Sequence, residues 1–378
     1  MAQFTFWTSL ALIAYAYFGY PILLYVLAGI RSRPVLRRSI EPTVSIIIAA
    51  YNEERGIRQK IEDTLALEYP NDKRTIIVAS DGSIDQTNEI VSEYAEQGVR
   101  LIACPDRKGK EQAQWEAIQV AKGEILVFSD ASTLLERQSL RQILSNFHDP
   151  GVGCVSSEDR VLGEENGSGG EGMYVKYEMW LRQLESRVGS LIGLSGSYFA
   201  VRKELCKDWV FDQDSDFLTA FRAVRQGYRA ISDPSAIAYY RAVPTAGREF
   251  KRKVRTVLRG IAGVVSHLEV LNPIKYRLFA VQVLSHKLLR WLVPMCMVTA
   301  LVSNAVLAQT SHFYLGIVIG QLVFYSLAIL GLLSKQLGRF QLFKVPAFFT
   351  MVNASIAVAW MQYFAGHRAI RWEPSQRT

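Results

Sequence analysis

The chain has 378 residues, enough for one large domain or two ordinary ones, and it carries a formal net charge of +8. None of its cysteines forms a C-x-x-C pair, so neither a zinc site nor a disulfide framework is indicated, and scattered thiols fit a reducing cytosol. Lysine and arginine cluster at residues 31–38 and 251–259, which suits lipid headgroups or nucleotide phosphates. No nucleic-acid module accompanies these clusters, so we expect no nucleic-acid partner.

An uncharged apolar segment opens the chain at residues 4–30. It is long enough to cross a hydrocarbon layer of about 30 Å. A cleaved signal peptide is the alternative, because residues 14–16 resemble a cleavage site, but no basic segment precedes them and the apolar run continues beyond. We therefore predict a retained transmembrane helix, kinked at Pro21. Arginines follow it at residues 31–38, and the positive-inside rule then places the next domain in the cytoplasm.

From residue 42 onward, β-prone stretches alternate with helical ones. Uncharged apolar runs predict buried strands, and apolar residues repeated every three or four positions predict helices. Strands are expected at residues 44–50, 75–80, 99–104, 124–130 and 152–156, and helices at 53–67, 85–97 and 109–122. Alternation at these lengths predicts an α/β fold with βαβ units and a mostly parallel sheet.

Polar residues mark the ends of three of these strands. Residues 51–54 follow the first strand, Asp81 follows the second, and Asp130 ends the strand at 124–130. Ligands bind at the carboxyl ends of strands in open α/β sheets, so we expect Tyr51, Asp81 and Asp130 to converge. Each of these loops also has a simpler interpretation, as a helix cap or a turn. A carboxylate at Asp130 beside the hydroxyl of Ser132 can hold a divalent cation that also grips phosphate oxygens.

Residues 44–54, 80–87, 109–110 and 128–132 together resemble the nucleotide-sugar half of family 2 glycosyltransferases, which have the GT-A fold. The resemblance covers about residues 42–272, and the flanking apolar segments are similar to those of cellulose and hyaluronan synthases. It implies a nucleotide-diphosphate sugar as donor, with a UDP-sugar favoured, and Mg²⁺ or Mn²⁺ as cofactor.

The resemblance also implies roles for individual residues. Asp81 matches the aspartate that contacts uracil, and Asp130 matches the first residue of the D-x-D metal motif. Ser132 stands at the second position of that motif, which removes one charged ligand. Contacts to the nucleotide sugar are expected from Ala49, Tyr51, Glu53, Asp81, Lys110 and Arg255.

The acceptor side of the site is expected in the second half of the domain. Residues 194–201 resemble the family strand that shapes it, and Ser195 and Gly196 would let a substrate come close. Asp216 matches the catalytic base by its spacing to Gly227, whereas Asp214 can be explained as a helix cap alone.

Two segments lie between the metal motif and the expected base. Residues 158–172 are acidic and glycine-rich, and we interpret them either as a mobile loop over the site or as a disordered insert. Apolar residues at 174, 177, 181, 184 and 188 then predict an amphipathic helix.

Residues 249–265 combine a basic stripe with an apolar face, which is typical of a helix lying on a membrane surface. Processive members of the family have Q-x-x-R-W at this place, and this chain has R-K-V-R-T at residues 252–256. Arg255 is in register and is expected to bind the diphosphate. The missing Gln and Trp argue against a processive polymerase. A second amphipathic stretch is expected at residues 276–290.

The C-terminal third is apolar. Residues 292–307 and 313–333 are predicted spans, and residues 345–366 form a less apolar third segment. If all three cross the membrane, the basic tail lies outside, against the positive-inside rule. We therefore leave open that the last segment re-enters the membrane.

These segments predict a multi-pass protein of the cell inner membrane with a cytoplasmic catalytic domain. The expected parts are a transmembrane helix at 1–31, a GT-A domain at 42–245, interfacial helices at 246–291, a transmembrane region at 292–366 and a basic tail at 367–378.

The expected function is inverting transfer of a sugar from a nucleotide-diphosphate sugar to a lipid-linked or glycan acceptor, in surface polysaccharide synthesis. Direct displacement needs one base, Asp216, and no carboxylate nucleophile. A processive polysaccharide synthase is the second hypothesis. A membrane-anchored protein that binds nucleotide sugars without turnover is a third, and it would not need Asp216. A transporter is not favoured, because the ionisable residues cluster outside the spans.

Overall fold

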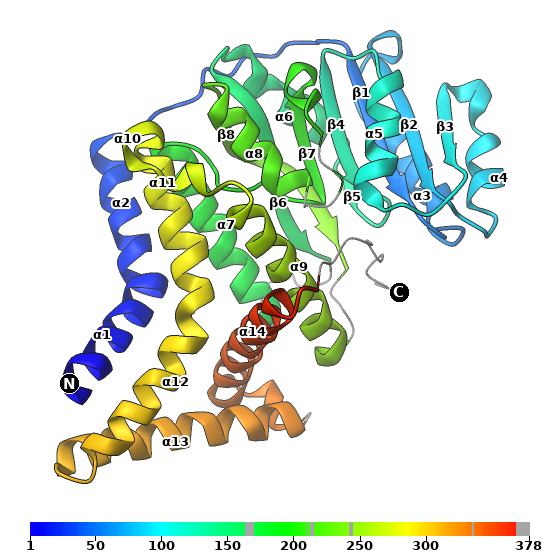
Figure 1. The fold of residues 1–378 in the computed structure, drawn as a ribbon. Helices are drawn as coiled ribbons and strands as arrows, with labels where there is room; N and C mark the ends of the chain where they lie inside the picture. The colour runs from blue at the N-terminus through cyan, green and yellow to red at the C-terminus, as the bar shows by residue number, and fades with distance from the viewer. Residues whose placement is uncertain (163–169, 210, 212–214, 242–244, 335, 368–378) are drawn as a thin grey trace.

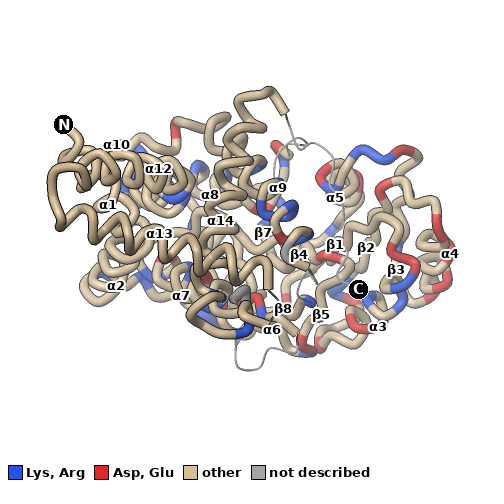
Figure 2. Tube along the Cα trace, turned by 90° about the horizontal axis from the view of Figure 1, so that it is seen from below, with Lys and Arg blue, Asp and Glu red and all other residues tan. Residues whose placement is uncertain are grey.

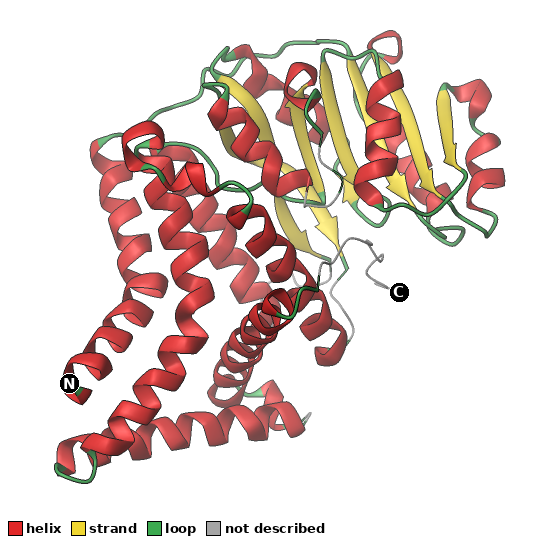
Figure 3. Cartoon of the chain, in the orientation of Figure 1, coloured by secondary structure: helices red, strands yellow, loops and turns green. Residues whose placement is uncertain are grey.

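The structure is a computed structural model that describes residues 1–162, 170–209, 211, 215–241, 245–334 and 336–367. An α/β domain lies beside a group of long helices, and helix α9 (Ala246–Val265) runs between the two parts (Figure 1). Figure 3 shows that the strands occupy one half of the molecule and that the other half is helical. The predicted combination of a sheet domain with terminal apolar helices is confirmed.

In the described part of the chain, eight strands form one sheet in the order β3-β2-β1-β4-β7-β6-β8-β5. The strands are β1 Val44–Ala50, β2 Arg74–Asp81, β3 Val99–Cys104, β4 Ile125–Asp130, β5 Leu134–Leu135, β6 Val152–Val161, β7 Tyr198–Arg202 and β8 Arg229–Tyr240. β1 pairs in parallel with β2 and β4, and β2 with β3. β7 runs antiparallel between β4 and β6, and β5 runs antiparallel to β8. The sheet is therefore mixed and mostly parallel, as predicted.

Helices cover both faces of the sheet because the central strands are apolar on both sides. The helices of this domain are α3 Ile57–Leu65, α4 Thr87–Ser92, α5 Lys110–Val120, α6 Ser139–Ser145, α7 Gly170–Val188 and α8 Ser215–Arg225. Ile46 and Ile48 of β1 belong to a core shared with α3, α4 and α6. Ile47, which points the other way, belongs to a core shared with α5 and α8. Two apolar layers thus hold the carboxyl ends of β1, β2 and β4 in place.

The helical half contains α1 Ala2–Ala14, α2 Tyr20–Ile30, α10 Pro273–Tyr276, α11 Leu278–Val283, α12 Arg290–Leu307, α13 His312–Leu333 and α14 Gln341–Phe364. Among the described residues, four continuous helices are long and apolar enough to cross a membrane: Ala2–Ile30, Leu278–Leu307, His312–Leu333 and Gln341–Phe364. Figure 2 shows that α1 and α13 are almost free of charged residues, whereas charges are frequent around the sheet. These helices support the prediction of a membrane protein.

Two of these helices contain a π-helical turn. The turn Tyr15–Gly19 joins α1 to α2, directly before Pro21, where we predicted a kink. The turn Leu284–Leu289 joins α11 to α12. The amphipathic stretch expected at residues 276–290 is therefore not separate from the following span, because one continuous helix runs from Leu278 to Leu307.

The third C-terminal segment, whose path the sequence leaves open, is a single helix of 24 residues, α14. It is long enough to span a bilayer. The basic tail begins beyond it, and residues 368–378 lie outside the described residues.

Two predicted boundaries are wrong around the acidic segment. The strand expected at residues 152–156 continues to Val161 because Glu158 to Val161 pair with β8. At the other end, α7 begins at Gly170, so the predicted loop at 158–172 is strand at its start and helix at its end. Its middle, residues 163–169, lies outside the described residues. The strand expected at 194–201 begins only at Tyr198.

Strand β8 is an element that the sequence analysis missed. The dipeptide Asp233-Pro234 interrupts its apolar pattern, yet Asp233 is 1% exposed. Its carboxylate accepts a hydrogen bond from the side-chain amide of Asn146 at 2.6 Å and pairs with Arg37 at 3.0 Å. These partners offset the cost of burying the charge in the strand.

Candidate active site

The carboxyl ends of β1, β2 and β4 meet at one edge of the sheet, as predicted. In the strand register, Ala49 lies between Asp130 on β4 and Ala79 on β2. The side chain of Ala49 is buried, at 2% exposure. Tyr51 and Glu53 follow directly in the loop after β1, so the expected donor residues gather around Asp130.

Asp81 is buried at this edge, and its carboxylate organises the loop that precedes α5. Its Oδ1 accepts hydrogen bonds from the main-chain N–H groups of Lys108 at 2.8 Å and Gly109 at 3.0 Å. The same loop passes so close to Gly82, which has a φ of +66°, that a Cβ there would lie 2.6 Å from the Arg107 nitrogen. Asp81 therefore holds the loop before α5 close to Gly82. Its contact with a uracil stays a prediction.

Tyr51 is covered by a cation that the sequence analysis did not single out. The guanidinium carbon of Arg107 lies 3.9 Å from the centroid of the Tyr51 ring. This distance is within the range of a cation–π contact. The pair presents planar groups beside the edge where the nucleotide is expected.

Lys110 connects the donor edge to the acceptor side. Its Nζ lies 2.5 Å from Oδ1 of Asp130 and 3.4 Å from the carbonyl oxygen of Gly196. Burial lowers the pKa of Lys110, but Asp130 and Asp216 more than offset this, so the pKa lies above its usual value. The ammonium is therefore charged at neutral pH and stands between two carboxylates.

A second lysine, Lys60, lies behind the Asp130 turn and was missed by the sequence analysis. It is 2% exposed, and its Nζ donates hydrogen bonds of 2.7 Å to Ser129 Oγ and to the Thr133 carbonyl oxygen. Burial lowers the pKa of Lys60 to about 7. Its two acceptors lie on either side of Asp130 in the chain, so Lys60 fixes the backbone that carries the expected metal ligands.

The donor set at Asp130 fits a divalent cation shared with a diphosphate. Burial raises the pKa of Glu53 to about 7, and the nearby carboxylates of Asp130 and Asp85 add to the shift. Ser132 is exposed two residues beyond Asp130. Within the described residues, no three His, Cys, Asp or Glu side chains are grouped around one possible metal position. Sites of one or two carboxylates completed by substrate phosphates are typical of Mg²⁺, and Mn²⁺ takes similar oxygen ligands.

Asp216, the expected base, lies at the start of α8 and accepts a hydrogen bond from the Phe217 N–H at 2.8 Å. A Cβ on Gly196 would lie 2.5 Å from Oδ2 of Asp216, so a side chain at residue 196 would displace the carboxylate from its present position. Ser195 instead donates to both carboxylate oxygens of Asp159, at 2.7 and 2.6 Å. Asp214 lies outside the described residues.

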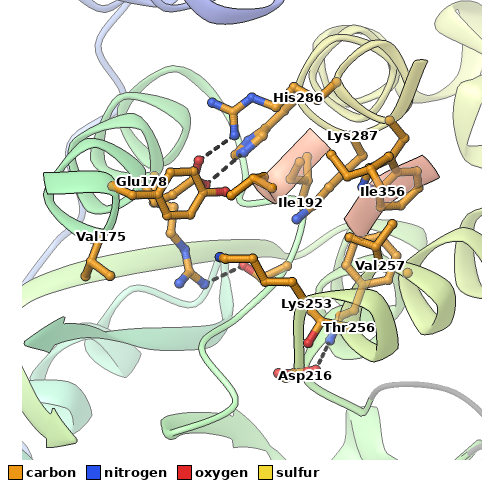
Figure 4. Close-up of a pocket in the computed structure, with 18 of the residues that line it drawn as sticks. Val175, Glu178, Ile192, Asp216, Lys253, Thr256, Val257, His286, Lys287 and Ile356 are labelled. Atoms are coloured by element: carbon orange, nitrogen blue, oxygen red, sulfur yellow. Dashed lines mark hydrogen bonds and ion pairs between the residues drawn. The ribbon is translucent and has the colours of Figure 1, made fainter. Parts of the chain in front are cut away.

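A cavity of about 330 Å³ opens beside Asp216 and extends toward the candidate membrane-spanning helices (Figure 4). It is lined by residues of α7, α9, α12 and α14 and of both π-helical turns, including Glu178, Arg182, Lys253, His286, Lys287 and Trp291. In Figure 4 Asp216 lies at one end of the cavity and His286 and Lys287 at the other. Arg255 is half-buried on α9, and its predicted contact with the diphosphate stays a prediction.

Residues 45–210 match the family model described as glycosyl transferase family 2. The chain carries a family 2 glycosyltransferase domain. The predicted resemblance is thereby confirmed for the donor edge. Asp216 and most of the cavity lie beyond the matched residues, so the roles of individual site residues stay predictions.

The glycosyltransferase domain accounts for the similarity to curated proteins. Over 221 residues the chain is 26% identical to the poly-β-1,6-N-acetyl-D-glucosamine synthases of Staphylococcus aureus and Staphylococcus epidermidis. The match covers 56% of this chain and 53% of those proteins, so the chain spans about half the length of the curated relatives it matches.

A solved structure has the same fold over almost the whole chain. The mannosyltransferase PcManGT from Pyrobaculum calidifontis, solved in complex with GDP-Man and Mn²⁺, superposes with a TM-score of 0.76. The superposition covers 97% of this chain and 100% of that one, at 23% sequence identity. The GT-A fold of the glycosyltransferase domain is confirmed, together with the arrangement of the flanking helices.

Proposed function

We propose that the protein transfers a sugar, with inversion, from a nucleotide-diphosphate sugar to a hydroxyl of a membrane-associated acceptor. The observation that supports this most is the contact path from Asp130 through Lys110 and Gly196 to Asp216. The leaving group and the attacking hydroxyl must lie on opposite sides of the transferred sugar, and this path joins the donor edge to the membrane-facing cavity.

On the donor side, Lys110 would bind the diphosphate, and Asp130 with Ser132 would hold Mg²⁺ or Mn²⁺. Such a cation, when bound, offsets the negative charge of the leaving diphosphate. The neighbour of the same fold was solved with Mn²⁺ and GDP-Man, which supports a divalent cation and a nucleotide sugar. A UDP-sugar is our favoured donor because of Asp81, and N-acetylglucosamine is the first sugar to test because of the relatives.

On the acceptor side, Asp216 would accept the proton of the attacking hydroxyl. The hydroxyl oxygen forms a bond to the anomeric carbon while the bond from that carbon to the diphosphate oxygen breaks. A helix N-terminus favours the ionised form of a carboxylate, and Asp216 accepts the Phe217 N–H there. One displacement with one base inverts the anomeric centre.

The membrane supplies the acceptor in this proposal. Residues of three candidate spans line the cavity beside Asp216, so an acceptor held in the bilayer reaches the base directly. The four candidate spans favour a multi-pass protein of the inner membrane, and the arginines at residues 31–38 favour a cytoplasmic position for its domain. The domain division at residues 31, 42, 245, 291 and 366 also stays a prediction.

Release of nucleoside diphosphate tests the proposal. The purified protein is incubated with a panel of nucleotide sugars, membrane lipid extract and Mn²⁺ or Mg²⁺. We expect release from one sugar, loss of release on chelation or in Asp130→Ala, and retained release in Ser132→Asp. No release from any donor would refute transfer, and unchanged release in Asp130→Ala would refute the metal site.

A processive synthase is the second candidate, and one contact favours it. Trp291 lines the cavity and packs on α9, where a Cβ on Gly260 would lie 2.9 Å from the indole. Trp291 therefore supplies an indole to the cavity, although the Trp of the Q-x-x-R-W motif is replaced by Thr256 in this chain. The relatives are also named as polymer synthases. We expect single-sugar products, and a ladder of long products in mass spectra would decide for the synthase.

A further inference from the structure

The two π-helical turns lie against each other at the membrane end of the cavity. The hydroxyl of Tyr15 in the first turn is 3.0 Å from Oγ of Ser285 in the second. Tyr17 from the first turn and His286 and Lys287 from the second line the cavity. Such turns are rare and occur frequently at functional sites. Their pairing here indicates that this end of the cavity has a role of its own.

Both carboxylates at this end, Glu178 and Glu185, have partners other than Lys287. Glu178 pairs with Arg290 and lies 3.1 Å from Nε2 of His286. Glu185 lies 2.7 Å from Nδ1 of His286 and accepts a hydrogen bond of 2.6 Å from the Tyr20 hydroxyl. This network ties α2, α7 and the second π-helical turn together, and among the described residues neither carboxylate forms a hydrogen bond or ion pair with Lys287.

Lys287 is a basic residue of the cavity that can still donate hydrogen bonds to a ligand. In the described part of the chain it makes no hydrogen bond and no ion pair, and its Nζ lies 5.6 Å from the Phe217 ring centroid. It belongs to the candidate span Leu278–Leu307. A charge inside a membrane segment is costly unless it has a partner, and such residues mark binding sites or pathways.

A second cation of the cavity, Arg182, donates hydrogen bonds only to neutral groups among the described residues. It donates hydrogen bonds to Ser156 Oγ at 3.1 Å and to the Gly193 carbonyl oxygen at 2.7 Å. These bonds fix its guanidinium beside the loop that leads to Gly196. Val352 and Ile356 of α14 line the same cavity, so an apolar chain would find a matching surface there.

We propose that Lys287 and Arg182 bind the phosphate or diphosphate group of a lipid-linked acceptor. The lipid chain would lie against the apolar residues of α14, and the sugar end would face Asp216. Basic pockets between membrane helices bind lipid phosphates, and an uncharged glycan would offer Lys287 and Arg182 no anionic group to bind. This inference rests on the proposed function and adds the chemical class of the acceptor.

Binding of a polyprenyl phosphate to the purified full chain in detergent tests the inference without turnover. The compared ligands are polyprenyl monophosphate, polyprenyl diphosphate, uncharged polyprenol and inorganic pyrophosphate. The compared proteins are the parent, Lys287→Met, Lys287→Arg and the control Lys275→Met, which removes a charge from an exposed site on α10 outside the cavity. We expect Lys287→Met to weaken binding of both polyprenyl phosphates about tenfold or more, with the control unchanged and Lys287→Arg close to the parent.

Lys287→Gln must show the same loss, which keeps the test decisive if the methionine variant does not fold. Equal binding of polyprenol and its phosphates would overturn the inference, as would unchanged affinity in Lys287→Met and Lys287→Gln. Pyrophosphate binding as tightly as the lipid would also overturn it, since the site would then recognise a free anion. Efficient transfer to an uncharged glycan by Lys287→Met would remove the lipid-linked acceptor but leave the proposed inverting sugar transfer intact. Lack of transfer from every donor would remove the proposed function while the binding result stood.

Discussion

Nζ of Lys110 and Oδ1 of Asp130 lie 2.5 Å apart, so the carboxylate expected to bind a metal ion already has a cationic partner. Both side chains are largely buried, at 11% and 21% exposure. A divalent cation that binds Asp130 must therefore share the carboxylate with Lys110 or displace it. Once displaced, the ammonium can turn to the diphosphate.

Replacement of Lys110 by methionine should separate its competition with the metal ion for Asp130 from its binding of the diphosphate. Without the competing ammonium, Mn²⁺ should bind at least as tightly as in the parent. Turnover should fall roughly 10²–10³-fold, because a positioned charge facing the leaving group is lost. Calorimetric Mn²⁺ titration and release of nucleoside diphosphate are measured on one preparation, with exposed Lys122→Met as the control. Weaker Mn²⁺ binding would mean that Lys110 serves instead to orient Asp130.

A methyl group at Gly196 should disable the base without unfolding the protein. The added Cβ would lie 2.5 Å from Oδ2 of Asp216, so the carboxylate must move. Because a displacement of about 1 Å can cost roughly 10²-fold in rate, Gly196→Ala should lower kcat strongly and leave donor affinity unchanged. Gly29→Ala, where a Cβ meets nothing within 4 Å, is the control. Parent-like kcat in Gly196→Ala would show that the position of Asp216 is not critical.

Replacement of Asp216 by asparagine distinguishes a base from a structural residue. Removal of a positioned general base typically costs roughly 10²–10⁴-fold in rate, and the donor residues at Asp81 and Asp130 are untouched. Asp216→Asn should therefore bind donor normally and barely turn over. Asparagine is also a good residue at a helix start, so stability should change little. Turnover within a few-fold of the parent would make Asp214 the next candidate, and a protein that binds without catalysing would show no turnover in either form.

The stability of the metal-free protein should depend on pH through Glu53. Its pKa rises from an ordinary 4.5 to about 7 on folding, through burial and the nearby Asp130 and Asp85. The stabilisation from neutral Glu53 is therefore complete below pH 4.5 and is lost as the pH rises to 7. Relative to that of Glu53→Gln, the melting temperature of the parent should fall between about pH 4.5 and about pH 7 and stay constant at higher pH. Glu54→Gln is the exposed control, and a difference between parent and Glu53→Gln that is constant with pH would contradict the raised pKa.

The donor edge was predictable because its pattern is local. β2 and β4 end on an aspartate and the polar residues 51–54 follow β1, and parallel strands bring such ends to one edge. Asp130 and Asp81 could be placed there without knowing the strand order. Asp216 was found by spacing to a glycine turn, and its contact with Gly196 follows from pairings that no local pattern shows.

The missed elements depend on partners far along the chain. Residues 158–160 of β6 look like loop because all three are charged, whereas in the fold their backbone pairs with β8 and Ser195 donates to Asp159. Lys60 offered one clue, since it falls on the same helical face as Ile57, Ile61 and Thr64, all of which are buried. A lysine on a buried face predicts a polar partner, and the sequence alone could not show that the partners are Ser129 and Thr133. The cavity was not predictable, because its walls come from segments that are hundreds of residues apart.

The first turn of α5 has a consequence for the whole molecule. Lys110 reaches toward Asp130, whereas the next residue, Glu111, forms a buried ion pair of 2.5 Å with Arg259 of α9. α9 in turn shares an apolar core with α14, where Leu258 and Ile261 belong to the same cluster as Ile356 and Ala359. A charged pair that is 2% and 5% exposed cannot slip without leaving its charges unpaired, so α5 and α9 move as one piece. With Lys110 as the proposed diphosphate ligand and α14 as a candidate span, we expect a tilt of α14 in a thicker or thinner bilayer to reach Lys110, so that lipid thickness would alter the rate of sugar transfer.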